Sequence, residues 1–147
     1  MKDKTIYPNK GVGKLQFGLS EEEVKQILGL PDETDTMTHD DGTSSLLLMY
    51  YDLGLHLSFD SDRDYTLTEI EIDSDEYHLD SKIQVGATKD ELLAYISTRG
   101  FEDPYVEDVS TEEEPGMELV ALDELGLNFW LEDNEINSIQ VGMAEDC

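Results

Sequence analysis

The sequence predicts an α+β fold of two tandem units, each with one helix packed on an antiparallel sheet. Three pairs of segments repeat in the same order and at nearly the same separation. The pairs are KLQFGLSEEEVKQIL and KIQVGATKDELLAYI (14–28 and 82–96), YDLGLHLSF and DELGLNFWL (51–59 and 123–131), and LTEIEI and INSIQV (67–72 and 136–141). Small differences in separation arise when insertions fall in loops. We therefore expect one compact domain with units at 10–78 and 79–143 and both helices on one side of the sheet.

The first helix is predicted at about residues 20–29. Ser20 can cap the helix, and Glu23 three residues later can complete a capping box by reaching back to the Ser20 N–H. Gly29 and Pro31 are typical of a helix end. The apolar stripe that would face the core consists of Val24, Ile27 and Leu28.

The second helix is predicted at about residues 88–98 from the same signals. Thr88 and Glu91 stand in the positions of a second capping box, and Gly100 and Pro104 follow the helix. Its apolar stripe consists of Leu92, Leu93 and Ile96.

Each helix is followed by an acidic polar loop and then by strands. The loops are residues 31–45 and 101–116. The predicted strands are SSLLLMYY, LHLSF and LTEIEI in the first unit and MELVAL, LNFWL and NSIQV in the second. Alternation of apolar and polar residues in the last two strands of each unit indicates one buried face and one open face.

The charge of the chain argues for a basic protein and against nucleic acid as its partner. The 147 residues include 36 Asp and Glu but nine Lys and Arg, a formal net charge of −27. Repulsion among so many negative charges lowers the stability of the folded chain. We therefore expect the charge to serve recognition of a basic protein rather than of nucleic acid, since binding phosphates needs clustered cations.

Cys147 is the only cysteine, which leaves no internal disulfide or cysteine zinc site. The N-terminal MKDKTIYPNK lacks the apolar segment of a signal peptide, and no apolar run could cross a bilayer. A cytoplasmic protein without a membrane partner is expected.

The segment GLSEEEVKQILGLP (18–31) resembles the helical signature of small outer-membrane assembly lipoproteins. Two such units in tandem resemble the architecture of the β-lactamase inhibitor protein. That resemblance implies helices that back a sheet whose concave face grips a partner. Small bacterial toxin immunity proteins are similar in being cytoplasmic, acidic and built on a binding scaffold. The chain departs from the lipoproteins because it has no signal peptide and no lipidated N-terminal cysteine.

Residues 60–71, DSDRDYTLTEIE, match most of the calcium-binding loop of an EF-hand. Asp60, Asp62, Asp64 and Glu71 occupy the first, third, fifth and twelfth places. Tyr65 occupies the sixth place, where glycine makes a sharp turn, and a positive φ at tyrosine is costly. The flanking segments are predicted strands, whereas an EF-hand needs helices. We interpret the stretch as a β-hairpin tip, with weak divalent-cation binding at Asp60–Asp64 as an open alternative.

Enzymatic motifs are lacking. The three histidines, His39, His56 and His78, have no metal-ligand spacing, and Ser20 is a helix cap rather than a nucleophile. We therefore expect no catalytic residues, no metal and no cofactor.

The open sheet face is the candidate binding site. In LNFWLE (127–132), Leu127, Phe129 and Leu131 should point to the core, which leaves the alternate residues on the open face. The partner-binding candidates are Tyr51, His56, Glu69, Glu71, Asp123, Asn128, Trp130 and Glu132. A competing interpretation packs Trp130, the only tryptophan, against the other unit or shifts the strand by one residue, which would reverse its face.

The expected function is an acidic protein-binding inhibitor, of the kind that immunity proteins exemplify. It would neutralise a basic toxin, with a nuclease as one candidate, by occluding the active site. An aromatic side chain ringed by carboxylates suits a binding hot spot for a Lys- and Arg-rich protein. The alternative, which follows from the lipoprotein resemblance, is a non-enzymatic scaffold or assembly factor.

Overall fold

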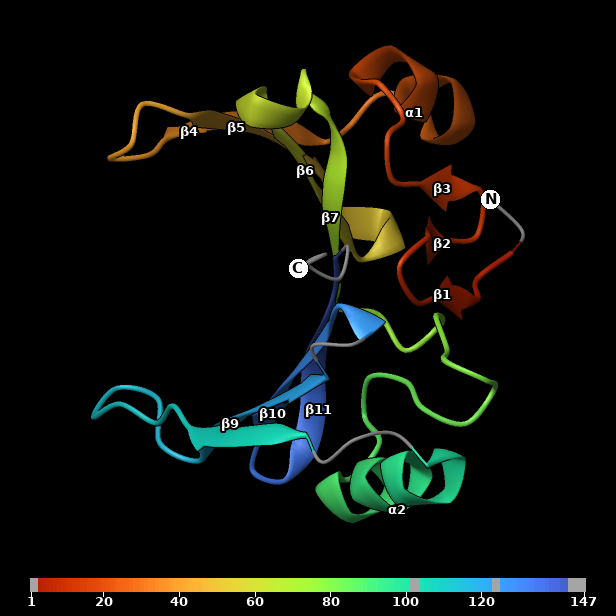
Figure 1. Ribbon diagram of the computed structural model, residues 1–147, viewed down its shortest axis with the longest axis vertical. Helices are drawn as coiled ribbons and strands as arrows, with labels where there is room; N and C mark the ends of the chain where they lie inside the picture. The colour runs from red at the N-terminus through yellow and green to blue at the C-terminus, as the bar shows by residue number, and fades with distance from the viewer. Residues whose placement is uncertain (1–2, 101–103, 123–124, 143–147) are drawn as a thin grey trace.

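The computed structural model describes residues 3–100, 104–122 and 125–142 (Figure 1). It contains helices α1 (Glu21–Leu28) and α2 (Lys89–Arg99), a three-stranded antiparallel sheet and a large eight-stranded antiparallel sheet. The α+β class predicted from the sequence is therefore confirmed. None of the helices in the described ranges has the length and apolarity needed to cross a bilayer.

The large sheet has the strand order β4-β5-β6-β7-β11-β10-β9-β8. Its strands are β4 (Glu33–Thr38), β5 (Ser44–Tyr50), β6 (Leu55–Asp60), β7 (Thr66–Ile72), β8 (Tyr105–Asp108), β9 (Met117–Leu122), β10 (Leu127–Glu132) and β11 (Glu135–Gly142). We call β4 to β7 the first half of this sheet and β8 to β11 the second half. The halves meet where β7 pairs with β11 over four residue pairs.

One buried apolar cluster joins both helices to the large sheet. It includes Val24 of α1, Leu92 and Ile96 of α2, and strand residues such as Phe59 and Phe129, all of them 3% exposed or less. In Figure 1, α1 and α2 are drawn to the right of the central strands, and the hairpins β4–β5 and β8–β9 extend to the left. Alternation along each strand directs a second set of side chains away from this cluster, and we call that surface the open face.

The helix caps follow the sequence prediction with one difference. At α1, the Ser20 Oγ accepts from the Glu23 N–H at 3.2 Å and the Glu23 Oε1 accepts from the Ser20 N–H at 3.1 Å, which confirms the capping box. At α2, the Thr88 Oγ1 accepts from the Glu91 N–H, but the Glu91 carboxylate accepts from the Thr88 hydroxyl. The second cap is therefore built on the hydroxyl group alone.

The acidic loops predicted at 31–45 and 101–116 contain the two edge strands, β4 and β8. All six residues of β4 are exposed, so no hydrophobic alternation marks this strand in the sequence. It forms because its backbone pairs in register with β5 from Glu33↔Met49 to Thr38↔Ser44. Three of its six residues are threonines, which favour extended backbone.

A small sheet lies beside the segment that links the two halves. It consists of β1 (Ile6–Tyr7), β2 (Gly11–Val12) and β3 (Leu15–Gln16), none of which was expected from the sequence. The backbone of the N-terminal segment also bonds to the linking segment, since the Ile6 N–H donates to the His78 carbonyl at 2.9 Å. Ile6, Val12 and Leu15 are buried in the core cluster.

The stretch that resembles a calcium loop is a β-hairpin connection, as predicted. A 3-10 turn, η2 (Ser61–Arg63), joins β6 to β7, so strands rather than helices flank it. Tyr65 nevertheless adopts a positive φ of 53°, directly after Asp64 at 57°, so its side chain does not exclude a left-handed turn at this place. Tyrosine tolerates the left-handed turn here because the pairing of two long strands stabilises it.

Candidate partner-binding face

A continuous row of side chains crosses the open face and takes one residue from each of the eight strands. Direct cross-strand partners lie on the same face of a sheet, so the pairing fixes this row without reference to side-chain rotamers. In strand order the row is Glu33, Met49, His56, Glu71, Gln140, Asn128, Ala121 and Tyr105. At about 4.8 Å between strands, the row spans roughly 34 Å along the sheet.

The predicted binding residues lie in or beside this row, with one outside the described residues. His56, Glu71 and Asn128 belong to the row itself. Glu69 is two residues before Glu71 on β7, and Trp130 is two residues after Asn128 on β10, so both are on the open face but on opposite sides of the row. Glu132 is at the exposed end of β10. Asp123 lies outside the described residues.

Trp130 is on the open face, and the register of β10 is the one expected. Trp130 pairs with Leu119 on β9 and Ser138 on β11, whereas its neighbour Phe129 is fully buried in the core. The indole Nε1–H donates to the Gln140 Oε1 at 2.9 Å, and the Asn128 Nδ2 donates to the same oxygen at 3.4 Å. These bonds fix the orientation of the half-buried indole on the open face.

Glu69 is a half-buried carboxylate at the middle of the open face. Burial raises the pKa of Glu69, and the negative charges of Glu71 and Asp60 raise it further. Within the described ranges, no hydrogen bond or ion pair reaches the Glu69 carboxylate. A partly desolvated carboxylate without a counterion is unfavourable, and a cationic partner would relieve the cost.

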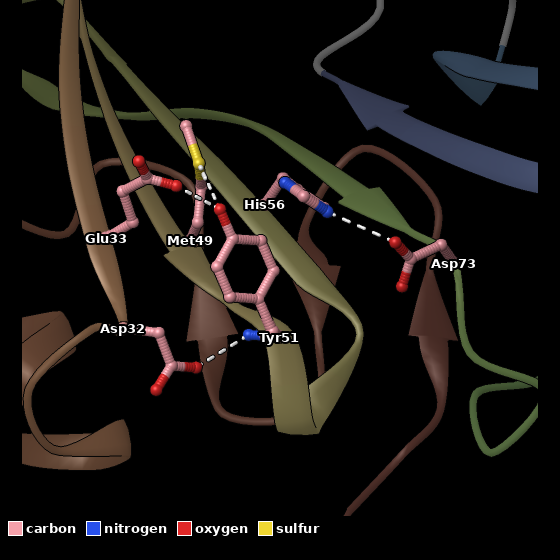
Figure 2. Close-up of polar contacts among 6 residues, drawn as sticks. All are labelled: Asp32, Glu33, Met49, Tyr51, His56 and Asp73. Atoms are coloured by element: carbon pink, nitrogen blue, oxygen red, sulfur yellow. Dashed lines mark hydrogen bonds and ion pairs between the residues drawn. The ribbon is translucent and has the colours of Figure 1, made fainter.

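Tyr51 forms a polar cluster at the end of β5 (Figure 2). It lies in the 3-10 turn η1 (Tyr51–Leu53), where its side chain is 54% exposed. The Tyr51 hydroxyl donates to the Glu33 carboxylate, which raises the pKa of Tyr51, and its N–H donates to the Asp32 Oδ2 at 2.8 Å. The Tyr51 ring stands edge-on to the His56 ring, with centroids 6.1 Å apart.

The same turn borders an acidic hollow. His56 contacts the Asp73 carboxylate at 3.1 Å, an ion pair when His56 is protonated. Asp73 also lines a surface hollow of about 440 Å³, with Tyr51, Asp52 and Asp75. The carboxylates that line this hollow therefore extend the negative charge of the first half beyond the ends of its strands.

Two groups of residues on the open face were not among the binding residues predicted from the sequence. A hydrogen-bonded chain runs from the His39 Nε2 through the Ser45 hydroxyl to the Asp60 Oδ1, at 2.8 and 2.7 Å, and the Thr68 hydroxyl donates to the Asp60 Oδ2 at 3.0 Å. The second group is apolar and consists of Met37, Leu47, Met49, Met117, Leu119 and Tyr105. Parity within SSLLLMYY and MELVAL could have identified most of the apolar group, whereas nothing in the sequence links His39 to Asp60.

No metal centre is formed by the residues that the structure describes, since no group of three or more His, Cys, Asp or Glu side chains comes together. In the calcium-like stretch, Asp60 points to the open face and both its oxygens accept hydroxyl hydrogen bonds.

No protein-family model matches the chain, and no curated protein matches it. Among solved structures, the chain is similar to the crystal structure of the uncharacterized protein yfeY from Escherichia coli, with a TM-score of 0.57 and 12% identity. The alignment covers 96% of this chain and 99% of that one. At this identity the likeness concerns the fold, and function has to be argued from the open face.

Proposed function

We propose that this protein is an acidic inhibitor that binds a basic protein through its open sheet face, in the manner of a toxin immunity protein. The observation that carries the proposal is the Glu69 carboxylate, which has no counterion among the described residues and shares the eight-stranded open face with Glu71 and Trp130. A cationic side chain of a partner would supply the missing counterion, and the indole of Trp130 would supply apolar contact area.

The charge of the whole molecule supports the same function. A net charge of −27 attracts a basic partner over a long range and can raise its association rate about 10 to 10³-fold. Rapid capture suits the neutralisation of a toxin before it acts. A nuclease is our candidate target because an enzyme that binds phosphates has a positive active-site cleft, which a negative face would cover.

The proposed function depends on how the two units and their helices are arranged. We propose that units 10–78 and 79–143 are tandem repeats with their helices on one side, so that the opposite side is left for the partner. The positions of the Ser20 and Thr88 caps in the repeated segments support this, as does the mirrored strand order of the two halves. We also propose that the protein acts in the cytoplasm, without catalysis, metal or cofactor.

A capture experiment with matched variants tests the function. The wild type, a face variant (Glu69→Gln, Glu71→Gln, Trp130→Ala) and a control variant (Glu22→Gln, Asp90→Asn) are each used to capture proteins from the native cell. Glu22 and Asp90 are exposed on the helices, so the control also removes two charges. We expect a basic protein to bind the wild type and the control but not the face variant. Co-expression with the wild type, but not with the face variant, should relieve that protein's toxicity.

Three outcomes would contradict the proposal. A partner held equally by all three proteins would place binding elsewhere. A neutral or acidic partner, or binding that is insensitive to salt, would remove the electrostatic mechanism. Capture of an outer-membrane assembly component would favour the scaffold alternative.

A further inference from the structure

The two halves of the open face differ in charge. The first half carries five carboxylates on this face, namely Glu33, Asp35, Asp60, Glu69 and Glu71. The described residues of the second half carry three, Glu107, Glu132 and Glu135, all of them exposed and on the outer rim. The sheet is continuous, but its chemistry changes at the junction of β7 and β11.

In the first half, each of two neighbouring cross-strand rows combines carboxylates with an apolar side chain. One row runs Asp35, Leu47, Ser58, Glu69, and its neighbour runs Glu33, Met49, His56, Glu71. Each row begins and ends at a carboxylate and has an apolar side chain between. Lysine and arginine have an apolar stem and a charged end, so such rows match their side chains in both parts.

In the second half, the row through Trp130 is apolar and aromatic at its centre. It runs Ser138, Trp130, Leu119, Glu107, and the neighbouring row runs Gln140, Asn128, Ala121 and ends in Tyr105. Tyr105 is 57% exposed, and Trp130 and Leu119 are partly exposed. An apolar or aromatic side chain of a partner would bury area here without leaving a carboxylate desolvated and unpaired.

We infer that the open face binds its partner in one orientation across the sheet. Lys and Arg side chains of a basic protein lie over β4 to β7, and an adjacent apolar or aromatic anchor lies over β8 to β10. The inference rests on the proposed function and adds the orientation and the kind of contact segment: a cluster of cations followed by an apolar residue. Charge complementarity selects this occupant over a second copy of the chain, which would place −27 against −27.

Trp130 provides a direct test, since it is the only tryptophan in the chain. Two synthetic peptides each consist of a run of arginines followed by a run of leucine and phenylalanine, and they differ only in the position of a single 4-bromophenylalanine. One carries 4-bromophenylalanine in the apolar run and the other carries it among the arginines. Bromine quenches indole emission on contact, so we expect the first peptide to quench Trp130 and the second to leave its emission nearly unchanged.

Two substitutions separate the contributions of the halves. Glu69→Gln with Glu71→Gln should weaken binding of either peptide about tenfold at physiological salt, and Glu22→Gln with Asp90→Asn should change it far less. Leu119→Ser should weaken these peptides but not an arginine peptide without the apolar run, and Leu30→Ser, at an 82% exposed site after α1, should affect neither.

The outcomes distinguish the inference from the function on which it rests. Equal quenching by the two peptides, or stronger quenching by bromine among the arginines, would overturn this orientation while leaving the face as the binding site. Absence of quenching by both, with equal affinities for the face and control variants, would overturn the proposed function as well.

Discussion

At the scale of single residues, Glu69 shows how a residue proposed to bind a partner can cost stability in the free protein. Its carboxylate is half-buried beside Glu71 and Asp60, and its pKa is raised. A group whose pKa is higher in the folded state binds protons more tightly there. Folding is therefore favoured below the ordinary pKa of glutamate, near 4.3, and loses that contribution as pH rises through the folded-state pKa.

This sign gives a prediction for Glu69→Gln. At pH 7 the variant should have a higher melting temperature than the wild type, because glutamine occupies the site without a charge. The difference should shrink as pH falls toward 4, where Glu69 is itself neutral. Thermal unfolding at several pH values measures both, with Glu22→Gln on α1 as the exposed control. A variant less stable than the wild type at pH 7 would show that Glu69 has a favourable partner.

Trp130 and Glu132 should affect binding through different rate constants. Trp130 is held at the centre of the second half, whereas Glu132 is exposed at the end of β10. Trp130→Ala should cost about 2 kcal/mol or more of binding free energy, mainly through faster dissociation, and Glu132→Gln should mainly slow association. Surface plasmon resonance with the captured partner at two salt concentrations separates the two. Equal effects on dissociation would contradict the assignment of centre and rim.

Sequence parity was sufficient to place Trp130, because Leu127, Phe129 and Leu131 define the buried side of β10 without ambiguity. Parity could not indicate that Glu69 lacks a counterion among the described residues or that His39 reaches Ser45. Both depend on which strands become neighbours, and β4, which carries the His39 hairpin, has no buried residue to reveal it.

At the scale of elements, helices and central strands could be predicted from local sequence patterns, whereas strands that form through long-range pairing could not. The caps, the glycine ends and the alternating central strands could be read along the chain, and α1, α2, β5, β6, β7, β9, β10 and β11 follow them. The exposed edge strands and the small N-terminal sheet could not, since they form through backbone pairing with partners specified elsewhere in the sequence.

The cap of α1 gives a stability prediction. Ser20→Ala removes the acceptor for the Glu23 N–H and should lower the free energy of unfolding by about 1 kcal/mol. Denaturant unfolding measures the change. Ser97→Ala, at an exposed position inside α2, replaces the same side chain where it caps nothing and should leave stability unchanged or slightly higher. Equal losses in both variants would show that the cap contributes nothing specific.

The hairpin between β6 and β7 gives a prediction about calcium. Tyr65→Gly restores the glycine that an EF-hand loop needs, yet strands still flank the loop and Asp60 remains bonded to Ser45 and Thr68. Calorimetry at physiological salt should find no site tighter than about the millimolar range in either the wild type or the variant. A stoichiometric sub-micromolar site that Asp62→Ala abolishes would restore the EF-hand interpretation.

At the scale of the whole molecule, repulsion should dominate the electrostatics of the free protein. The described residues form four ion pairs that involve Lys or Arg, and a fifth, His56 with Asp73, when His56 is protonated, while the chain carries 36 acidic side chains. Sodium chloride should therefore raise the melting temperature, because the Debye length falls from about 10 Å at 0.1 M to about 3 Å at 1 M. Calorimetry across that range measures the effect, and a fall in melting temperature would show that attractive pairs prevail.

The seam between β7 and β11 bears on how the chain acquires its fold. Six of the seven strand pairings in the large sheet join strands that are consecutive among its members, and only β7 with β11 closes over the distance between the halves. Pairing of nearby strands is fast, whereas distant pairing must first overcome the entropy of a long loop. We therefore expect each meander to assemble separately and the seam to form last. During synthesis, the first meander can be complete before β11 has left the ribosome.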